Sequence, residues 1–215
     1  MMHKVMAGIV MVFAGPAVAE PVIIAALGDS LTQGYGLPVE DGLVPQLQTW
    51  LDENGAEVTL VNAGVSGDTT AGGLSRVGWT LTPDVDGMIV ALGGNDLLRG
   101  LDPAVSRANI DGILEAAKGA DVEVLLVGMT APGNYGPEYK SVFDALYPEL
   151  ADQYGTEFLN SFFAGLAVDG EMPELSQAQA FFQPDGVHPN KEGVAKIVTA
   201  MGPKVLELIE DIKAN

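Results

Sequence analysis

The chain has 215 residues, enough for one domain, and its 29 acidic against 10 basic residues give a formal charge of −19. This balance argues against nucleic-acid binding, which needs a basic surface, and against adsorption to anionic membranes. A hydrophobic content of 47% allows a large core, and the absence of cysteine excludes disulfides, thiolate metal sites and a cysteine nucleophile.

The first 19 residues have the pattern of a secretory signal peptide. Lys4 precedes an apolar run at residues 5–13, and Ala-Val-Ala at residues 17–19 forms an A-x-A cleavage site. The run is shorter than the roughly 20 apolar residues that span a bilayer, so a stable membrane anchor is not expected. We expect cleavage after Ala19, export to the periplasm, and a single mature domain over residues 20–215.

Five short apolar segments alternate with longer amphipathic ones through the mature chain. Four of the short segments are rich in Val, Ile and Leu without strict alternation, which predicts strands buried on both faces of a parallel sheet; the fifth, at residues 157–159, is a weaker strand candidate. Asp102 and Pro103 mark one helix start, and Gly119 follows the end of that helix. The predicted strands are 22–27, 58–61, 88–92, 122–127 and 157–159, and the predicted helices are 43–54, 70–78, 103–118, 138–154 and 191–213.

This alternation predicts the α/β class. Right-handed crossovers between parallel strands give a three-layer α/β/α sandwich with a central, mainly parallel five-stranded sheet, flavodoxin-like in its layers. Polar, glycine-rich loops follow the first three strands at residues 28–30, 62–69 and 93–96, and another lies at 185–189. Because the carboxyl ends of parallel strands share one edge, where such sheets bind ligands, the loops predict one site.

Ser30 is a candidate nucleophile at this edge. A serine hydroxyl needs a base, and His188 is the one imidazole left once His3 departs with the signal peptide. Asp185, three residues earlier, is placed to orient the far ring nitrogen. Taken singly, these residues also fit a turn and a helix cap, whereas a metal site would lack a second His or Cys.

Acyl transfer also needs donors aimed at the developing oxyanion. The Ser30 and Gly67 backbone N–H groups and the Asn95 side-chain amide are candidates, although Gly67 and Asn95 taken singly also fit ordinary turns. Further polar residues are expected to support the site through partners that the sequence does not give: Asp29, Ser66, Asp68, Asp96 and Arg99.

The sequence resembles the SGNH hydrolases, also called GDSL esterases and lipases. Four blocks carry the resemblance in family order: GDSLTQGYG from residue 28, NAGVSGDTTAGGLSR from 62, ALGGNDLLRG from 91 and DGVHPN from 185. The resemblance covers essentially the whole mature chain. It implies a Ser30–His188–Asp185 triad, an oxyanion hole from Ser30, Gly67 and Asn95, and neither metal nor cofactor.

One branch of the family is especially similar, that of secreted acyl-CoA thioesterase I, arylesterase and lysophospholipase. In that branch the stretch matching residues 130–136 forms a mobile loop beside the acyl groove. The loop start is smaller and less apolar here, which predicts a shallower acyl contact and a preference for short-to-medium acyl or aryl esters. The substrate-loop candidates are Thr130, Ala131, Pro132, Asn134 and Tyr135.

The predicted function is hydrolysis of small carboxylic esters or thioesters through an acyl-enzyme on Ser30, by a monomer. One alternative is a carbohydrate O-acetyl esterase on the same scaffold, since a fold does not determine its substrate. Another is a flavodoxin-like ligand-binding protein without catalysis. The chain lacks a G-x-G-x-x-G or P-loop lysine pattern for phosphate, and it lacks the G-x-S-x-G elbow of α/β-hydrolases.

Overall fold

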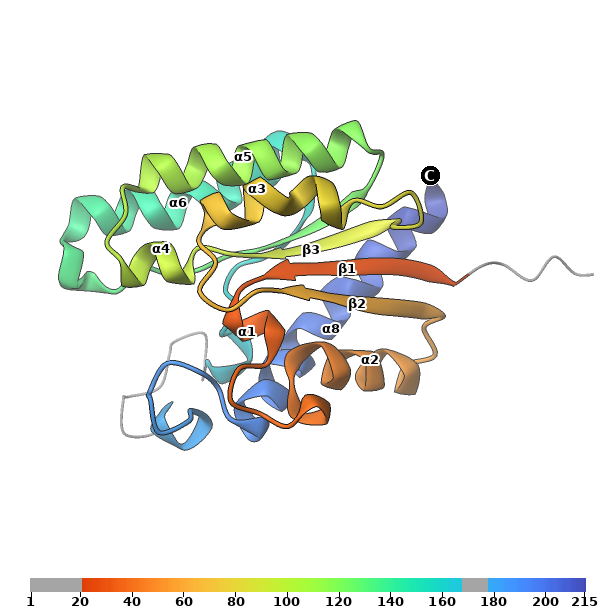
Figure 1. Cartoon of the computed structure of the whole chain (residues 1–215), viewed down its shortest axis with the longest axis horizontal. Helices are drawn as coiled ribbons and strands as arrows, with labels where there is room; N and C mark the ends of the chain where they lie inside the picture. Colours follow the sequence, from red (N-terminus) through yellow and green to blue (C-terminus); the bar gives the residue numbers. More distant parts are fainter. Residues whose placement is uncertain (1–20, 168–177) are drawn as a thin grey trace, which may run out of the picture.

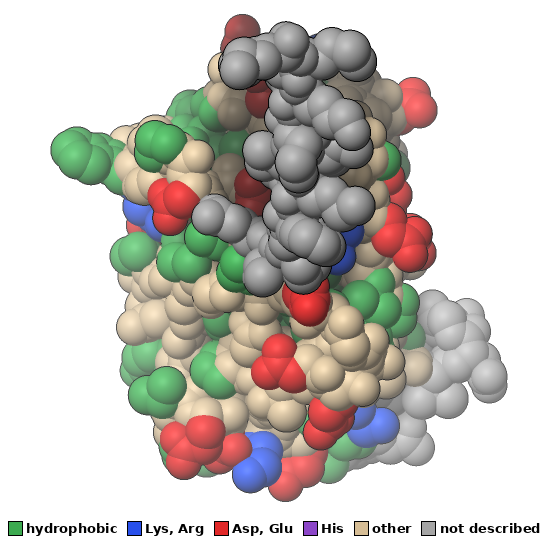
Figure 2. All heavy atoms as spheres, turned by 90° about the vertical axis from the view of Figure 1, so that its right-hand side faces the viewer, with side chains coloured by type: hydrophobic (Ala, Val, Ile, Leu, Met, Phe, Trp, Pro, Cys, Tyr) green, Lys and Arg blue, Asp and Glu red, His purple; other side chains and the backbone are tan. Residues whose placement is uncertain are grey.

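The computed structural model describes residues 21–167 and 178–215. The predicted signal peptide and its cleavage site lie outside the described residues. Among the helices of the described ranges, none is both long and apolar enough to cross a bilayer. On the face shown in Figure 2, Asp and Glu side chains are spread widely with fewer Lys and Arg, in keeping with the net charge of −19.

A parallel five-stranded sheet forms the middle layer (Figure 1), in the order β2-β1-β3-β4-β5. The strands are β1 (Val22–Gly28), β2 (Val58–Gly64), β3 (Gly87–Ala91), β4 (Glu123–Val127) and β5 (Glu157–Leu159). Gly28 at the end of β1 pairs with Gly64 of β2 and with Ala91 of β3. These three strands therefore end at the same level, and the loops that follow them begin side by side.

Helices cover both faces of the sheet. In Figure 1, α3, α5 and α6 lie over one face and α2 and α8 over the other, while α1 and α4 sit at the carboxyl ends of the strands. The helices are α1 (Ser30–Gln33), α2 (Leu43–Glu53), α3 (Thr70–Thr80), α4 (Gly94–Leu98), α5 (Pro103–Gly119), α6 (Pro137–Tyr154) and α8 (Lys191–Ala214). The predicted α/β/α sandwich with its five-stranded parallel sheet is confirmed.

Side-chain caps set the starts of three helices. The Thr69 hydroxyl accepts from the Gly72 N–H at the start of α3, and the Asn190 amide oxygen accepts from the Gly193 N–H at the start of α8. Asp102 accepts from the Ala104 N–H at 2.9 Å, with Pro103 in the first turn of α5. Each cap satisfies an N–H group that has no partner inside its helix.

Strand β2 departs from the prediction of strands buried on both faces. Val61 is 45% exposed, because β2 lies at the edge of the sheet. Gln48 of α2 bonds the outer edge of β2: its amide donates to the Val58 oxygen at 3.0 Å and accepts from the Leu60 N–H at 2.8 Å. The prediction was wrong for β2 because apolar composition does not distinguish an edge strand from a central one. The outer backbone N–H and C=O groups of an edge strand have no neighbouring strand, and here the Gln48 side chain bonds some of them.

Helix α4 was not predicted, because the composition of residues 93–96 indicated a polar loop. Gly93 has φ 116°, a conformation that favours glycine, and it turns the chain directly from β3 into the helix. Only five residues long, α4 is too short to show a helical apolar period. The turn places Asn95 in the first turn of α4, next to the end of β3.

Close packing of α2 on α8 leads to a stability prediction. A Cβ on Gly202 of α8 would lie 2.4 Å from the Trp50 ring, whereas a Cβ on Gly78, in the exposed part of α3, would meet nothing within 4 Å. Gly202→Ala should lower the free energy of unfolding by about 1–3 kcal/mol through overpacking. Gly78→Ala should raise it by about 0.5–1 kcal/mol, since alanine favours helix. Urea unfolding of both variants tests this pair, and a stabilised Gly202→Ala would contradict the packing.

Candidate active site

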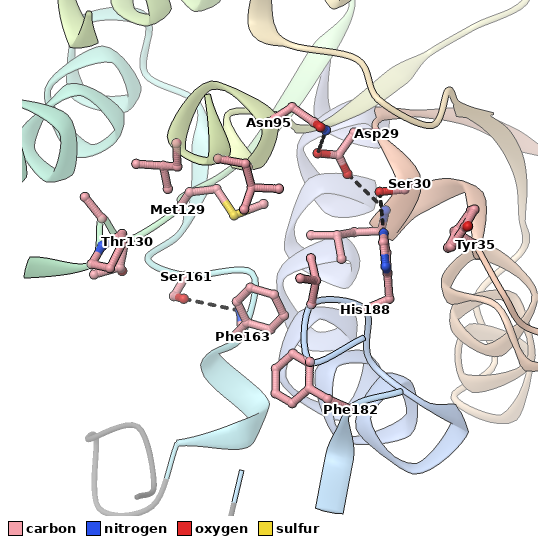
Figure 3. A pocket seen from close by; sticks show the side chains of 18 of the residues that line it. Asp29, Ser30, Tyr35, Asn95, Met129, Thr130, Ser161, Phe163, Phe182 and His188 are labelled. Carbon is pink, nitrogen blue, oxygen red and sulfur yellow. Dashed lines mark hydrogen bonds between the residues drawn. The ribbon is translucent and has the colours of Figure 1, made fainter. Parts of the chain in front are cut away.

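Four segments carry the candidate residues at the carboxyl edge of the sheet, and Figure 3 shows Ser30, Asn95 and His188 from three of them. Ser30 opens α1 directly after β1, and Asn95 lies in α4 after β3. Gly67 lies in the loop between β2 and α3. His188 lies before α8, in a loop that an antiparallel bridge between Phe182 and Pro189 closes at its base. The single predicted site is thus formed from segments far apart in the sequence.

Ser30, His188 and Asp185 form a continuous hydrogen-bonded chain. The Ser30 Oγ lies 2.8 Å from Nε2 of His188, and Nδ1 of His188 lies 2.7 Å from Oδ2 of Asp185. With Asp185 on Nδ1, the proton of a neutral ring is held on that nitrogen, which leaves Nε2 as an acceptor for the serine proton. The three residues have the arrangement of a serine nucleophile, its base and the carboxylate that orients the base.

Asp185 is held in its ionised form by hydrogen bonds. Its Oδ1 accepts from the backbone N–H groups of His188 at 3.0 Å and Val187 at 2.9 Å. These two bonds and the one from the His188 ring lower the pKa of Asp185 from 3.8 to about 2. The side chain is 40% exposed, so donors, and not burial, determine its charge. A permanent negative charge therefore faces the imidazole.

Asn95 is oriented by the buried carboxylate of Asp29. Nδ2 of Asn95 donates to Asp29 Oδ2 at 3.1 Å, and the second N–H of the amide remains for another acceptor. Asp29 Oδ1 also accepts from the Leu31 N–H at 2.9 Å, which caps α1. Burial raises the pKa of Asp29, and the bonds from Leu31 and Asn95 oppose that shift. The role of Asp29, which the sequence left open, is to connect α1 to the Asn95 amide.

The Gly67 peptide is fixed from both sides. Gly67 has φ 84°, and its carbonyl oxygen accepts from the Arg99 guanidinium at 2.8 Å. Its neighbour Ser66 hydrogen-bonds Gln33 of α1. No protein group in residues 21–167 or 178–215 accepts from the Gly67 N–H. Ser66 and Arg99 thus hold the loop while the N–H that was predicted as an oxyanion donor stays available.

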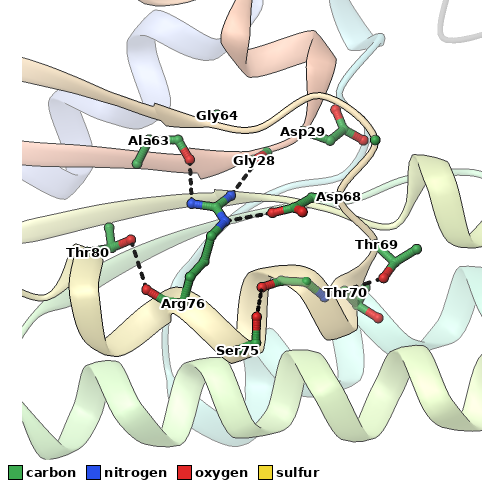
Figure 4. A network of polar contacts seen from close by, with 12 residues as sticks. Gly28, Asp29, Ala63, Gly64, Asp68, Thr69, Thr70, Ser75, Arg76 and Thr80 are labelled. Carbon is green, nitrogen blue, oxygen red and sulfur yellow. Dashed lines mark hydrogen bonds and ion pairs between the residues drawn. The ribbon is translucent and has the colours of Figure 1, made fainter.

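Arg76 ties the same loop to the ends of two strands (Figure 4). Its Nη1 donates to the Ala63 oxygen at 2.7 Å and its Nη2 to the Gly28 oxygen at 2.9 Å, while Nε pairs with Asp68 at 2.6 Å. One guanidinium therefore links β1, β2 and the loop that carries Gly67. Sequence reasoning missed this role of Arg76. The one sequence signal for this role was the presence of a basic residue within the second block, in a helix that packs against the sheet.

The side chain of Asp96 lies away from the cleft and belongs to a buried network of polar side chains. Its carboxylate accepts from the Thr70 N–H at 2.9 Å, from the Thr70 hydroxyl at 2.6 Å and from the Ser106 hydroxyl at 3.0 Å. Asp96 and Ser106 are fully buried. The network joins α4 to α3 and α5, and so it fixes the helix that carries Asn95.

A cleft of about 1120 Å³ opens beside the candidate triad of Ser30, His188 and Asp185. The triad side contributes Ser30, His188 and Asn95. Much of the remaining wall is apolar, and sequence reasoning did not connect the segments of its last two members to the site: Leu97, Leu98, Met129, Phe163 and Phe182. Apolar walls with few polar groups suit an organic substrate with a single reactive polar centre. Across the described ranges, no three His, Asp or Glu side chains are grouped to hold a metal ion.

The five substrate-loop candidates all line the cleft: Thr130, Ala131, Pro132, Asn134 and Tyr135. Hydrogen bonds hold this loop near both of its ends. The Ala131 N–H donates to Asp144 at 2.7 Å, and Lys140 donates to the Ala131 oxygen at 2.8 Å. The Tyr135 hydroxyl donates to the Leu97 oxygen at 2.7 Å, which connects the loop to α4.

Comparison with known proteins identifies the family. Residues 26–196 match the sequence profile of the GDSL-like Lipase/Acylhydrolase family. The chain belongs to this family. The match spans most of the chain and contains all the candidate triad and oxyanion residues.

The similarity to three named relatives extends over most of this chain and most of each relative. The chain is 33% identical over 194 residues to Esterase TesA of Pseudomonas aeruginosa, covering 90% of this chain and 91% of that one. It is 33% identical over 172 residues to an arylesterase of Vibrio mimicus, covering 79% and 80%. The solved structure of AlinE4, a SGNH-hydrolase family esterase, is 42% identical, has a TM-score of 0.70 and covers 89% and 98%. The resemblance to SGNH hydrolases is confirmed.

The lowered pKa of Asp185 predicts how its contribution to stability changes with pH. Because the folded pKa of about 2 lies below the ordinary 3.8, the stabilisation by the carboxylate is complete above pH 3.8 and is lost as the pH falls towards 2. Asp185→Asn should therefore destabilise the protein more at pH 5 than at pH 3. Urea unfolding of both proteins at the two pH values measures the difference, and an equal gap would contradict an ionised Asp185.

Proposed function

We propose that this chain is a serine esterase that hydrolyses carboxylic esters through an acyl-enzyme on Ser30. The proposal rests above all on the hydrogen-bonded chain from Ser30 through His188 to Asp185, with distances of 2.8 and 2.7 Å. Membership of the GDSL-like lipase/acylhydrolase family and an apolar cleft beside Ser30 support it. The same geometry gives each of the three residues a role.

In the first half of the reaction, the Ser30 oxygen attacks the ester carbonyl carbon and its proton passes to Nε2 of His188. The Asp185 carboxylate, hydrogen-bonded to Nδ1, stabilises the imidazolium that forms. The carbonyl oxygen becomes an oxyanion that accepts from the Ser30 and Gly67 N–H groups and from the free N–H of Asn95. His188 then returns its proton to the leaving oxygen, and the acyl group stays on Ser30.

In the second half, water takes the place of the alcohol. His188 removes a proton from the water as its oxygen attacks the acyl carbon, and the same three donors hold the second oxyanion. The Ser30 oxygen leaves and recovers its proton from His188, which releases the carboxylic acid. A thioester would follow the same steps with a thiol as leaving group.

We further propose a preference for short-to-medium acyl or aryl esters. Ala131 is almost fully buried and Thr130 is small, so the start of the substrate loop offers an acyl chain little apolar surface. The arylesterase of Vibrio mimicus is one of the relatives that match along most of the chain. Apolar wall supplied by Met129 and Phe163 would hold the acyl carbons nearest the carbonyl.

The roles of the nucleophile and an oxyanion donor predict large losses of activity. Ser30→Ala should reduce hydrolysis of p-nitrophenyl acetate to the background rate, and Asn95→Ala should lower kcat on the order of 100- to 1000-fold. Ser75→Ala and Asn54→Ala, at exposed positions outside the cleft, are matched controls that should keep wild-type rates. Circular dichroism checks folding. Unchanged turnover in folded Asn95→Ala would overturn its role.

The chain-length preference has a direct test. For p-nitrophenyl acetate, butyrate, octanoate and palmitate, kcat/KM should be highest for one of the shorter chains, because the loop start gives long chains few contacts. Steady-state kinetics below the micelle concentration of each ester supply the values. A clear optimum at palmitate would contradict the assignment, although the serine mechanism would stand.

Two other functions make different predictions. A carbohydrate O-acetyl esterase would release acetate from acetylated sugars faster than from p-nitrophenyl acetate, and the apolar walls of Leu97, Met129 and Phe182 do not favour a polyhydroxylated substrate. A ligand-binding protein without catalysis would not react with a fluorophosphonate. Labelling of the wild type that disappears in Ser30→Ala, together with slow release from acetylated sugars, supports the esterase.

The sequence also leads us to propose export. Residues 1–19 would be removed as a signal peptide and residues 20–215 would form the mature periplasmic domain, acting as a monomer because one chain supplies every candidate catalytic group. Expression of the full chain in a Gram-negative host should yield periplasmic protein whose first residue is Glu20 by N-terminal sequencing. Uncleaved protein retained in the cytoplasm would contradict the signal peptide.

A further inference from the structure

The ring of Tyr35 packs beside the imidazole of His188, and the proposed mechanism gives Tyr35 no role. Its ring centroid lies 4.7 Å from that of His188, with the two planes tilted by 39°. The side chain lines the cleft and is 53% exposed, although a tyrosine ring would gain by burial. Within residues 21–167 and 178–215, its hydroxyl has no protein hydrogen-bond partner. The ring therefore offers an open face beside the candidate base.

The backbone fixes Tyr35 in this place. Helix α1 ends at Gln33 and is capped by Gly34, which has φ 87°, and the Tyr35 N–H donates to the Ser30 oxygen at 3.1 Å. The chain thus reverses directly after the nucleophile helix and returns Tyr35 to the triad. Its position is coupled to that of Ser30 by a single turn of chain.

Gln183 joins the Tyr35 segment to the His188 loop. Its side-chain amide donates to the Tyr35 oxygen at 2.8 Å, across 148 residues of sequence, and to the Pro189 oxygen at 3.0 Å. Its backbone N–H donates to the His188 oxygen at 2.8 Å. A Cβ at Gly36 would lie 2.2 Å from the Gln183 amide oxygen, so the close approach depends on glycine. The contact between the two rings is therefore held from the backbone of both segments.

The direction of the leaving group follows from the reaction geometry. Three substituents surround the tetrahedral carbon on Ser30: the oxyanion points to Gly67 and Asn95, and the leaving oxygen points to Nε2 of His188. The acyl group takes the remaining direction. Figure 3 shows Met129 and Phe163 on one side of the Ser30–His188 pair and Tyr35 on the other. An acyl group in the apolar part of the cleft leaves the alcohol beside the two rings.

Resting on the proposed esterase function, we propose that the rings of Tyr35 and His188 form a leaving-group platform that favours esters of aromatic alcohols. The aromatic ring of a benzyl ester, two bonds from the ester oxygen, reaches the open face of Tyr35 while that oxygen remains at Nε2 of His188. Offset or tilted stacking between rings at such distances is favourable. A methyl or ethyl alcohol is too small to make this contact. Gln183 acts as a positioning residue for the platform.

The test compares kcat/KM for two esters of the same acid that differ only in their alcohol. In benzyl acetate and ethyl acetate the acyl group is identical and both leaving groups are alkoxides, so their ratio of kcat/KM isolates contact with the alcohol. Tyr35→Ala should lower the benzyl-to-ethyl ratio by about 2- to 10-fold, the range for one aromatic contact, and Tyr35→Phe should preserve it. The ratio for ethyl hexanoate against ethyl acetate should not change in either variant.

Controls separate the platform from a general effect. Trp79→Ala, at a tryptophan that is 86% exposed and outside the cleft, should leave both ratios at their wild-type values. An equal loss for all three esters in Tyr35→Ala, with a shifted pH profile of kcat/KM, would mean that Tyr35 only supports His188, and it would overturn the platform. A change confined to the acyl ratio would overturn it too. Activity retained in Ser30→Ala would instead refute the esterase mechanism itself.

The role of Gln183 is tested through its coupling to Tyr35. Gln183→Leu keeps the approximate size of the side chain but removes both amide hydrogen bonds, and it should lower the benzyl-to-ethyl ratio in the same direction. In the double variant with Tyr35→Ala the ratio should fall no further, since the two residues act on one contact. Independent, multiplicative losses in the double variant would show that Gln183 does not position Tyr35.

Discussion

The level alignment of three strand ends is the constraint on which the site depends. Gly28 of β1 pairs with Gly64 of β2 and with Ala91 of β3, so the segments that carry the candidate nucleophile and the two other candidate oxyanion donors begin at the same level of the sheet. The guanidinium of Arg76 holds the ends of β1 and β2 together by donating to the backbone oxygens of Gly28 and Ala63. A Cβ on Gly28 or Gly64 would lie within 2.4 Å of α1, so glycine at both ends lets the nucleophile helix pack there.

Carboxylates around the site have distinct tasks although the chain as a whole is strongly acidic. Asp29 and Asp185 orient the amide of Asn95 and the imidazole, each while accepting backbone N–H groups. Asp68 pairs with Arg76, and Asp96 joins three helices away from the cleft. Each of these carboxylates is matched by hydrogen-bond donors, which compensates the cost of taking a carboxylate out of water.

Much of the fold and the central residues could be predicted because they follow from local patterns. Apolar runs of strand length, caps such as Asp102 and the four blocks gave element bounds within a few residues and all the candidate catalytic groups. The exposure of β2 was missed because only the strand order shows which strand is at the edge. Two sets of contacts were missed: those of Arg76 with the strand-end oxygens of Gly28 and Ala63, and that of Gln183 with the oxygen of Tyr35. Their acceptors are backbone atoms, which leave no pattern of residue types in the sequence.

In the proposed mechanism Ser30 carries the acyl group, and the oxyanion is held by Gly67, Asn95 and the N–H of Ser30 itself. A crystal structure of the chain after reaction with an alkyl fluorophosphonate tests this most directly. We expect a phosphorus–oxygen bond to the Ser30 Oγ, with the phosphoryl oxygen about 3 Å from all three nitrogens. An adduct on another residue, or a phosphoryl oxygen turned away from Gly67 and Asn95, would contradict it.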